Sequence, residues 1–560
     1  MKLKRSLSIL LIFCFFIAIL MPGTAAAAAP DTKIPSAFWS LVTPYQNALN
    51  TNDLNNIIVY GNKIIELFNG MEETQQVLEI ITPRLEQVAK AYEALGKFDL
   101  AVEYFSRYIP KAEKLGWKDG VTYAKSKINT LGFDIELYAK TTNLEKSVYF
   151  GSKYEPRSGV YFGSNYDTDP RIGAYRWDDI KNYFPRKNTA YLTYLHWNED
   201  IKSFDRYFMD ATANNIALQL AWNIEDSEID NVLKSIKSYD SYIRATADYL
   251  GKLKIPVFLR FAGEMNIKDN CKDSNSFIAA FRYVSEIMRS KAPNVAMVWS
   301  PNDVSAKGRT YDQYYPGDEY VDWIGISTYT QRYFQGKKDW GSLQDTNDSV
   351  YMTGNYANPL AKIKPIMDAY GTKKPIMISE TGVGHYAKLA GEDLSPWAKV
   401  QLRRLYTYGP MIYPELKGIY YFNANNDIIT KYDDYSLYGN SAFNELYNEL
   451  VNSGNFISSI NGNPGFRYEK VTDYSISGLK LELSTYTVVP KVLNPTVQYK
   501  LDGNVHAVRT VIPYSIELDL SAVPKGGHKL TVEIYDGNNK MGSREYMLII
   551  SDNNVNLKGN

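Results

Sequence analysis

The spacing of apolar residues divides the chain into three regions with different periods. From residue 37 to about 142, apolar residues recur three and four positions apart, which predicts helices. Between about 147 and 451, short β-rich runs alternate with helical stretches, a pattern typical of βα units with a parallel sheet. After a stretch rich in Gly, Asn and Ser, apolar and polar residues alternate with period two, which predicts short antiparallel strands joined by turns such as Asp536-Gly537.

The middle region contains eight β-rich runs. They begin at residues 159, 189, 216, 256, 295, 321, 375 and 418. Eight strands with intervening helices in about 300 residues predict a (β/α)8 (TIM) barrel. An open, doubly wound sheet would usually have fewer strands, and the chain has no glycine-rich phosphate loop.

The two outer regions have weaker signatures. In the helical region, two stretches align with each other, matching Ala48 with Ala94 and Asp53 with Asp99. The second stretch resembles a tetratricopeptide helix pair, and an ordinary helical hairpin domain is the alternative. The last region suggests a β-sandwich of immunoglobulin type and resembles the bacterial immunoglobulin-like modules of secreted enzymes. Such a module could bind glycan or act as a spacer.

The N-terminus has the features of a secretory signal peptide. Lys2, Lys4 and Arg5 precede an apolar segment, and an alanine run at 25–29 supplies the small residues of a cleavage site. We expect a secreted, extracellular protein, which could also be associated with the cell surface; retention of the segment as a membrane anchor is the alternative. No other segment approaches the roughly 20 apolar residues needed to span a bilayer.

The expected organisation is therefore that of a multidomain chain. It comprises a signal peptide (1–29), an all-α domain like tetratricopeptide repeats (30–146), a (β/α)8 domain (147–452), a linker (453–468) and an all-β immunoglobulin-like sandwich (469–560).

Charge and cysteine content exclude several classes of function. Lys plus Arg and Asp plus Glu both number 62, so no net field would gather nucleic acid or an anionic membrane. Cys14 leaves with the signal peptide, and Cys271 alone can form neither an intrachain disulfide nor a cysteine-based metal site. The four His are scattered without ligand spacing, so no metal or other cofactor is expected.

Polar and aromatic side chains stand at the ends of the barrel strands. The carboxyl ends of such strands form the active-site face, so a polar residue there lies in the site and not in the core. The residues in these positions are His196, Trp197, Trp222, Asn223, Glu264, Asn266, Asn302, Tyr329, Glu380 and Asn423. Together they predict a polar cleft with aromatic walls.

Two of these residues, Glu264 and Glu380, end the fourth and seventh strands, which face each other across the barrel. Glycoside hydrolysis needs one carboxyl to protonate the departing oxygen and another to attack or to activate water. We expect Glu264 to be the acid/base and Glu380 to be the nucleophile. A separation of about 5.5 Å would make the enzyme retaining.

The motifs around these glutamates resemble those of glycoside hydrolase family 26, which includes many β-mannanases. "RFAGEMN" (260–266) is similar to the fourth-strand motif, "VWSPN" to the fifth and "PIMISETG" to the nucleophile strand. The resemblance implies a retaining, endo-acting hydrolase of β-linked polysaccharide with Glu264 and Glu380 in the roles given above. It also implies that Tyr329 hydrogen-bonds the nucleophile and that the charge of Arg260 keeps Glu380 ionised.

The chain departs from this family pattern in two places. Gly263 stands where the family usually has a histidine, and Tyr421 or Phe422 replaces the tryptophan of the eighth strand. The reaction class is unaffected, but the substrate stays open between β-mannan, another β-glycan and a bacterial exopolysaccharide.

Further residues are candidates for substrate binding or support of the glutamates. They are Arg260, Asn266, His196, Trp197, Trp222, Trp299, Asn302, Tyr329 and Tyr421. The alternative for His196 is a structural role, and the alternative for the three Trp is core packing.

Two other classes of function remain open. The chain could be a carbohydrate-binding pseudoenzyme, which the departure at Gly263 favours and the two intact glutamates oppose. It could also be a cell-surface assembly protein whose helical repeats dock a protein partner.

Overall fold

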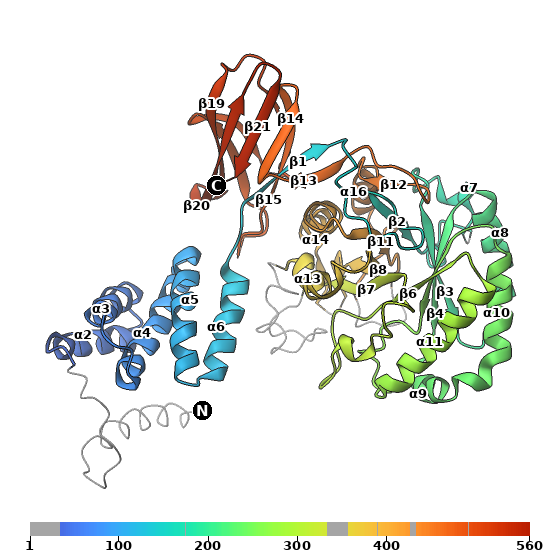
Figure 1. Ribbon diagram of the computed structural model, residues 1–560, viewed down its shortest axis with the longest axis horizontal. Helices are drawn as coiled ribbons and strands as arrows, with labels where there is room; N and C mark the ends of the chain where they lie inside the picture. Colours follow the sequence, from blue (N-terminus) through green and yellow to red (C-terminus); the bar gives the residue numbers. More distant parts are fainter. Residues whose placement is uncertain are drawn as a thin grey trace, which may run out of the picture. The chain divides into compact units, whose positions relative to one another are not determined.

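The computed structural model describes residues 34–173, 175–332, 357–388, 390–425, 433–490 and 492–559. The expected signal peptide lies outside these ranges. The chain forms two compact units, Met1–Gly132 and Phe133–Asn560 (Figure 1). Across the described ranges, no helix combines the length and the apolar character that crossing a membrane requires.

The first unit is helical, as the apolar spacing predicts. Its helices are α2 (Ala37–Thr51), α3 (Leu54–Leu67), α4 (Gln75–Ala94), α5 (Phe98–Lys114) and α6 (Lys118–Leu131). The Asp53 side chain caps α3 by accepting from the Asn56 N–H at 3.1 Å, and Thr74 caps α4 in the same way. Each helix packs against the next through small and apolar side chains. The assignment to tetratricopeptide repeats stays a prediction.

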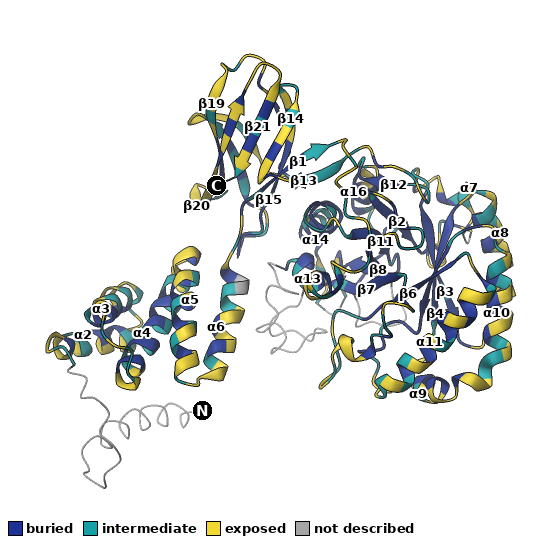
Figure 2. Cartoon of the chain, in the orientation of Figure 1, coloured by how far each residue is buried: buried dark blue, intermediate teal, exposed yellow. Residues whose placement is uncertain are grey.

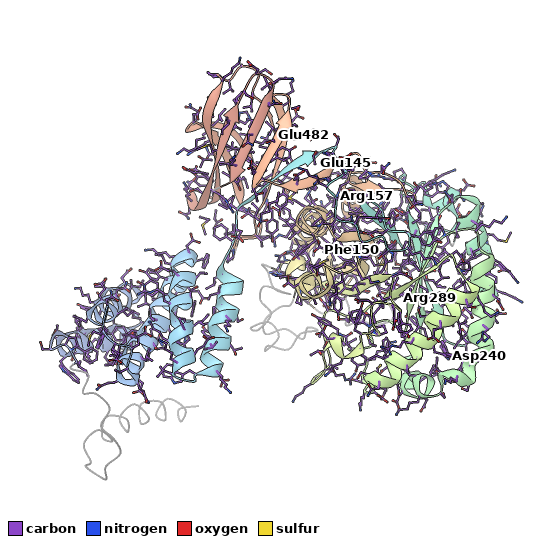
Figure 3. All side chains as sticks on the ribbon, viewed as in Figure 1. Glu145, Phe150, Arg157, Asp240, Arg289 and Glu482 are labelled. Carbon is purple, nitrogen blue, oxygen red and sulfur yellow. The ribbon has the colours of Figure 1, made fainter. Side chains whose placement is uncertain are left out.

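The helical pattern expected as far as residue 142 ends earlier than predicted, because β1 (Glu136–Thr141) is a strand. It pairs antiparallel with β13 (Arg467–Lys470) and β15 (Lys480–Tyr486). Lys140 of β1 forms an ion pair at 3.0 Å with Glu482 of β15, which Figure 3 labels. Leu137, Tyr138 and Ala139 are all buried, so this strand lacks the alternation that would have distinguished it from a helix.

The middle region forms a barrel-like parallel sheet, and all eight predicted strands are present. They are β2 (Val160–Ser164), β3 (Ala190–His196), β4 (Ala217–Asn223), β5 (Val257–Phe261), β6 (Val295–Trp299), β7 (Trp323–Thr330), β8 (Ile376–Val383) and β11 (Leu416–Tyr421). The order is β12-β2-β11-β8-β7-β6-β5-β4-β3. A backbone hydrogen bond of 3.0 Å from Thr189, just before β3, to Phe162 of β2 joins the two sides of the sheet.

Helices cover the outside of this sheet. They are α7 (Trp177–Ile180), α8 (Asp205–Ala213), α9 (Asp226–Lys234), α10 (Asp240–Lys252), α11 (Ser274–Lys291), α13 (Pro359–Tyr370), α14 (Ser395–Arg403), α15 (Gly409–Ile412) and α16 (Ser441–Val451). Shorter elements are the 3-10 turns η2 (Ile201–Phe204), η3 (Ile236–Tyr239) and η4 (Tyr311–Tyr314), the π-helical turn η5 (Arg404–Tyr408), and the two-residue strands β9 (Tyr386–Ala387) and β10 (Glu392–Asp393). Figure 2 shows buried strands inside and exposed outer helix faces.

The interior of the barrel changes character along its axis. Tyr161, Phe258 and Trp323 pack together at the amino ends of their strands, with ring centroids 5.3 to 6.2 Å apart. Polar side chains replace these rings toward the carboxyl ends, where Gln219 and Arg260 are buried. The barrel therefore has an apolar floor and a polar face above it.

The C-terminal strands form two antiparallel sheets. They are β14 (Asp473–Ser477), β16 (Thr496–Leu501), β17 (Asn504–Arg509), β18 (Ile516–Asp519), β19 (Gly526–Asp536), β20 (Asn539–Ile550) and β21 (Asn554–Gly559), with β1, β13 and β15. The orders are β13-β1-β15-β18 and β14-β21-β20-β19-β16-β17. Along β20, buried Tyr546, Leu548 and Ile550 alternate with exposed neighbours, which confirms the period-two prediction. The immunoglobulin-like assignment stays a prediction.

The expected linker, 453–468, is partly strand. β12 (Phe456–Ile457) pairs with β2 of the barrel sheet, and β13 begins at Arg467. Because β1 precedes the barrel and β13 follows it, the barrel is inserted between two paired strands of the C-terminal β domain.

Candidate active site

Glu264 stands on an unusual turn that follows β5. Ala262 and Glu264 have left-handed backbone angles, with φ of +46° and +61°. Such angles are uncommon for residues other than glycine and cost on the order of 1–3 kcal/mol each. Two hydrogen bonds hold the turn, from the Ala262 N–H to the Trp222 carbonyl (2.9 Å) and from the Glu264 N–H to the Ser300 carbonyl (2.8 Å). The turn carries Glu264 out of the strand and leaves its side chain 27% exposed.

Two asparagines support Glu264. The Asn302 side-chain amide donates to Glu264 Oε1 at 2.9 Å. Asn266 holds Asn302 in place, since its Oδ1 accepts from the Asn302 N–H and its Nδ2 donates to the Asn302 carbonyl, both at 2.8 Å. Both asparagines lie beside Glu264 as the sequence predicts, but the amide groups of Asn266 are engaged by the loop and not open to a ligand.

Glu380 is brought to the same face by a β-bulge in β8. Ile378 pairs with both Ile326 of β7 and Ile419 of β11, and the register then shifts in both ladders, so that Ser327 pairs with Glu380. A bulge re-aims the following side chains. Ser379 can therefore reach Ser300 inside the barrel, Oγ to Oγ at 2.7 Å, while the next residue, Glu380, contacts Arg260 there.

Arg260 connects the two glutamates. Its Nη1 donates to Glu380 Oε2 at 2.5 Å, and its Nη2 lies 3.7 Å from Glu264 Oε1 and donates to Ser327 Oγ at 2.7 Å. Burial alone would lower the pKa of Arg260, but the negative charges of Glu380 and Glu264 raise that pKa above its ordinary value. A permanent positive charge therefore lies between the two carboxylates.

Tyr329 holds the other oxygen of Glu380. Its hydroxyl donates to Glu380 Oε1. Burial, and next the negative charge of Glu380, raise the pKa of Tyr329 well above its ordinary value. The phenol therefore stays protonated and acts as a donor, and each carboxylate oxygen of Glu380 has one donor.

An aromatic wall stands beside these groups. The half-buried ring of Phe422 lies 5.9 Å from the Tyr329 ring and 6.2 Å from the Tyr194 ring. Tyr421, which the sequence named with Phe422 as the eighth-strand aromatic, is fully buried and donates its hydroxyl to the Tyr435 carbonyl at 2.9 Å. Phe422, and not Tyr421, thus packs against the tyrosine that contacts Glu380.

Tyr194 was missed by the sequence argument. Tyr194 lies two residues after Leu192 in β3, so both side chains are on the same face of the strand. The side chain of Leu192 lies in the barrel interior. Burial, and next the charge of Glu380, raise the pKa of Tyr194 well above the ordinary value, so its hydroxyl lies in the field of the site. Because β3 is buried on both faces, no signal in the sequence marks Tyr194 as inward-facing.

The other predicted substrate residues make their described contacts with groups other than the two glutamates. Trp222 and Trp299 have no exposed surface and pack outward, with Trp222 Nε1 donating to the Tyr242 hydroxyl at 3.2 Å. Trp197 is also buried, with its ring 5.0 Å from that of Trp222. For these three residues the core alternative applies. His196 is exposed and contacts Glu225 at 3.1 Å.

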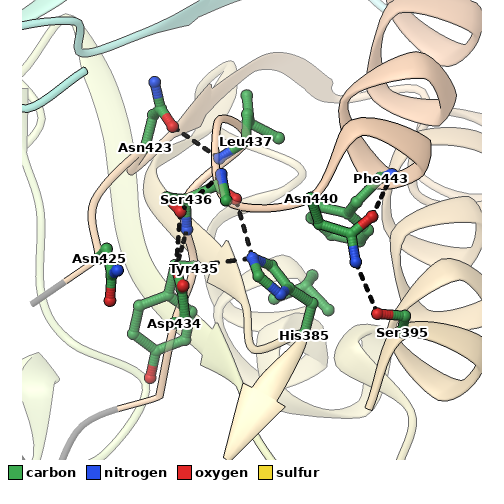
Figure 4. Close-up of polar contacts among 12 residues, drawn as sticks. His385, Ser395, Asn423, Asn425, Asp434, Tyr435, Ser436, Leu437, Asn440 and Phe443 are labelled. Atoms are coloured by element: carbon green, nitrogen blue, oxygen red, sulfur yellow. Dashed lines mark hydrogen bonds and ion pairs between the residues drawn. The ribbon is translucent and has the colours of Figure 1, made fainter. Parts of the chain in front are cut away.

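A second polar network joins the loops that follow β8 and β11 (Figure 4). His385 Nε2 donates to the Ser436 carbonyl at 2.9 Å and lies 3.5 Å from Asp434 Oδ1. Tyr435 lies between Asp434 and Ser436 in the sequence, and its ring is 5.2 Å from the ring of Tyr329. The network therefore supports the tyrosine that contacts Glu380.

Residues of the types that bind metals, and one cysteine, lie within the described ranges. No group of three or more His, Cys, Asp or Glu in these ranges could hold a metal ion. Cys271 is buried and free, and burial raises its pKa to about 12, so the thiol stays protonated near neutral pH.

Comparisons with known proteins assign the barrel to a class. The family model "Glycosyl hydrolase family 26" matches residues 174–389, a stretch that contains both glutamates. The domain is therefore that of a glycoside hydrolase. More narrowly, residues 174–389 match family 26, in agreement with the resemblance of the strand motifs.

Individual relatives cover only parts of the chain. Endoglucanase H of Acetivibrio thermocellus is 30% identical over 236 residues, 40% of this chain and 24% of the relative. Beta-1,3-xylanase TXYA of a Vibrio species is 31% identical over 106 residues, 18% of this chain and 22% of the relative. The chain thus spans about a quarter of the length of these curated relatives.

The solved structures to which the chain is similar include two mannanases. The β-mannanase BoMan26A of Bacteroides ovatus has 18% identity and a TM-score of 0.39, covering 55% of this chain and 92% of its own. The endo-β-1,4-mannanase of Thermotoga petrophila has 13% identity and a TM-score of 0.37. The match covers 70% of this chain and 97% of the mannanase chain.

Proposed function

We propose that this protein is a secreted, retaining endo-hydrolase of a β-linked polysaccharide, with Glu264 as acid/base and Glu380 as nucleophile. The observation that carries the proposal is the contact of one buried guanidinium, Arg260, with both carboxylates. Groups that share one guanidinium lie close together, and a retaining pair needs a separation of about 5 to 5.5 Å.

In the first step, a carboxylate oxygen of Glu380 attacks the anomeric carbon and forms an ester bond. The bond from that carbon to the leaving oxygen breaks, and Glu264 gives its proton to this oxygen. Tyr329 and Arg260 each donate to one oxygen of Glu380, so they hold the carboxylate in one orientation for the attack.

In the second step, a water oxygen attacks the same carbon while Glu264 accepts the proton of the water. The ester bond breaks and Glu380 leaves as a carboxylate, so the sugar keeps its original configuration. The partial exposure of the Glu264 side chain supports its role, because this group must exchange protons with water in each cycle.

We rank β-glucan and β-1,3-xylan ahead of β-mannan as substrates. The curated relatives that match parts of the chain are an endoglucanase and β-1,3-xylanases. Gly263 also departs from the histidine of the mannanase motif. A bacterial exopolysaccharide remains the fourth candidate.

The chain termini bear on where the enzyme works. The basic and apolar start of the sequence supports secretion. The helical unit could dock a protein partner, and the C-terminal β domain could act as a spacer.

The experiment is an assay of new reducing ends with purified protein on mixed-linkage β-glucan, β-1,3-xylan, β-mannan and the exopolysaccharide of the producing organism. We expect one polymer to be cut internally, and proton NMR of the early product to show retained β configuration. Glu264→Gln and Glu380→Gln should each lose most of the activity. Glu225→Gln is the matched control, because Glu225 is an exposed glutamate whose ion-pair partner is His196.

Cleavage with inversion would overturn the assignment of Glu380 as nucleophile. Full activity in either variant, or the absence of cleavage of all four polymers, would overturn the proposal as a whole.

A further inference from the structure

Gly263 packs directly against the guanidinium group of Arg260. A Cβ atom added to Gly263 would lie 2.4 Å from Arg260 Nε and 3.0 Å from both Cζ and Nη2. Nonbonded carbon and nitrogen atoms do not approach each other to 2.4 Å. Any side chain at position 263 is therefore incompatible with the observed position of Arg260.

Arg260 has little room to give way. Its side chain is 2% exposed, and its terminal nitrogens are engaged by Glu380 and Ser327. Its Nε–H has no hydrogen-bond partner among the described residues, although the atom is buried. A buried donor without a partner is costly, so strong surrounding contacts must hold this guanidinium where it is.

The backbone around Gly263 is adapted to the same contact. Ala262 and Glu264, on either side, both have left-handed angles. The chain thereby turns over the guanidinium, with Gly263 facing Nε and Glu264 returning to within 3.7 Å of Nη2. One turn therefore positions both the acid/base candidate and the cation next to it.

We propose that Gly263 is a positioning residue, whose missing side chain leaves the space that lets Arg260 bridge Glu264 and Glu380. This inference rests on the proposed function for its catalytic meaning, but the steric coupling stands independently of any activity. A histidine at this position, as in the usual family motif, would require another position for Arg260. The glycine and the bridging arginine therefore form a single unit.

The test is a double-mutant cycle with Gly263→Ala and Arg260→Ala, read out as kcat, KM and the urea midpoint of unfolding. In the wild-type background, Gly263→Ala should lower kcat roughly 100-fold with little change in KM, because displaced catalytic groups cost about this factor. It should also lower the unfolding midpoint. In the Arg260→Ala background, the same substitution should change kcat less than about threefold and leave the midpoint in place, because the clash is gone.

The matched control is Gly527→Ala in β19. No heavy atom lies within 4 Å of its added Cβ, and its backbone angle is not left-handed. It should leave kcat and the unfolding midpoint unchanged.

Equal effects of Gly263→Ala in both backgrounds would overturn the inference, since the glycine would then serve the backbone alone. Should Arg260→Ala not fold, the crystal structure of Gly263→Ala decides: we expect the Arg260–Glu380 hydrogen bond to be broken, and an intact bond overturns the inference. A wild-type protein that cuts no glycan but shows the coupling in unfolding would refute the proposed function and leave the positioning role intact.

Discussion

Glu264 and Glu380 reach the same face of the barrel by different backbone devices. Glu264 follows β5 on a left-handed turn outside the strand, whereas Glu380 lies within β8 at a bulge. The Glu264 side chain is 27% exposed and accepts from the neutral amide of Asn302. The Glu380 side chain is 11% exposed and accepts from a guanidinium and a phenol.

This difference separates two chemical tasks. A carboxyl group that exchanges protons needs access to water, and a carboxylate that attacks carbon needs fixed orientation and stabilised charge. Glu264 has the first environment and Glu380 the second. The proposed roles therefore agree with these surroundings, even though the two side chains are chemically identical.

The largest effect should come from Glu380→Ala. Loss of the nucleophile should lower kcat on the order of 10⁵-fold. Azide can then enter the vacated space and attack the anomeric carbon from that side, giving an α-glycosyl azide. If proton NMR identified a β-glycosyl azide instead, the assignment of the two glutamates would have to be reversed.

Glu264→Ala should cost about 10²- to 10⁴-fold on the natural polymer, because protonation of the leaving oxygen is lost. An aryl glycoside whose leaving group needs no proton should lose much less in its first step. Azide should give the β-glycosyl azide here, the opposite of the result for Glu380→Ala. Equal losses on both substrates would contradict the role of Glu264 as the acid.

Tyr329→Phe removes one donor from Glu380 and should lower kcat on the order of 10²-fold. The pKa of Tyr329 is raised well above its ordinary value, so its ionisation should contribute no loss of activity up to about pH 10. The pH profile of the wild type, compared with that of Tyr329→Phe, checks this point. A loss in the wild type below pH 9 that is absent from the variant would show that the phenol titrates.

Asn302→Ala should have the smallest effect, about tenfold on kcat, because Glu264 keeps the nearby charge of Arg260. The loss should fall on the natural polymer and spare the aryl glycoside, as for Glu264→Ala. Asn423→Ala, which removes a buried asparagine that follows β11 and accepts from the Leu437 N–H at 2.7 Å, is the comparison for general loop damage. An equal loss on both substrates would show that Asn302 does not act through the acid function of Glu264.

Strand existence could be predicted, but the direction of some side chains could not. The eight apolar runs of the barrel are buried on both faces and stand out from the helices between them. Within such runs apolar and polar residues do not alternate, so the sequence does not show which side chains face outward. Trp222 and Trp299 could therefore not be recognised as outward-facing core residues. The bulge at Ser379 and Glu380 shifts the register in both ladders of β8, and the sequence does not mark it.

Contacts over long sequence distances explain the remaining differences. β1 is a strand because it pairs with β13 and β15, more than 300 residues further along the chain. The motif "RFAGEMN" predicted the site through Glu264 and Arg260, and it marked Gly263 as a departure. Only the folded turn relates that departure to the guanidinium group of Arg260.

Covalent trapping of the nucleophile tests the central claim most directly. The protein is incubated with a 2-deoxy-2-fluoro glycoside of the sugar it cleaves, carrying a good leaving group, and the labelled peptide is identified by mass spectrometry. We predict one label per chain, on Glu380, formed rapidly in the wild type and absent in Glu380→Gln. A label on Glu264, or an enzyme that turns over its polymer but is never labelled, would contradict the assignment.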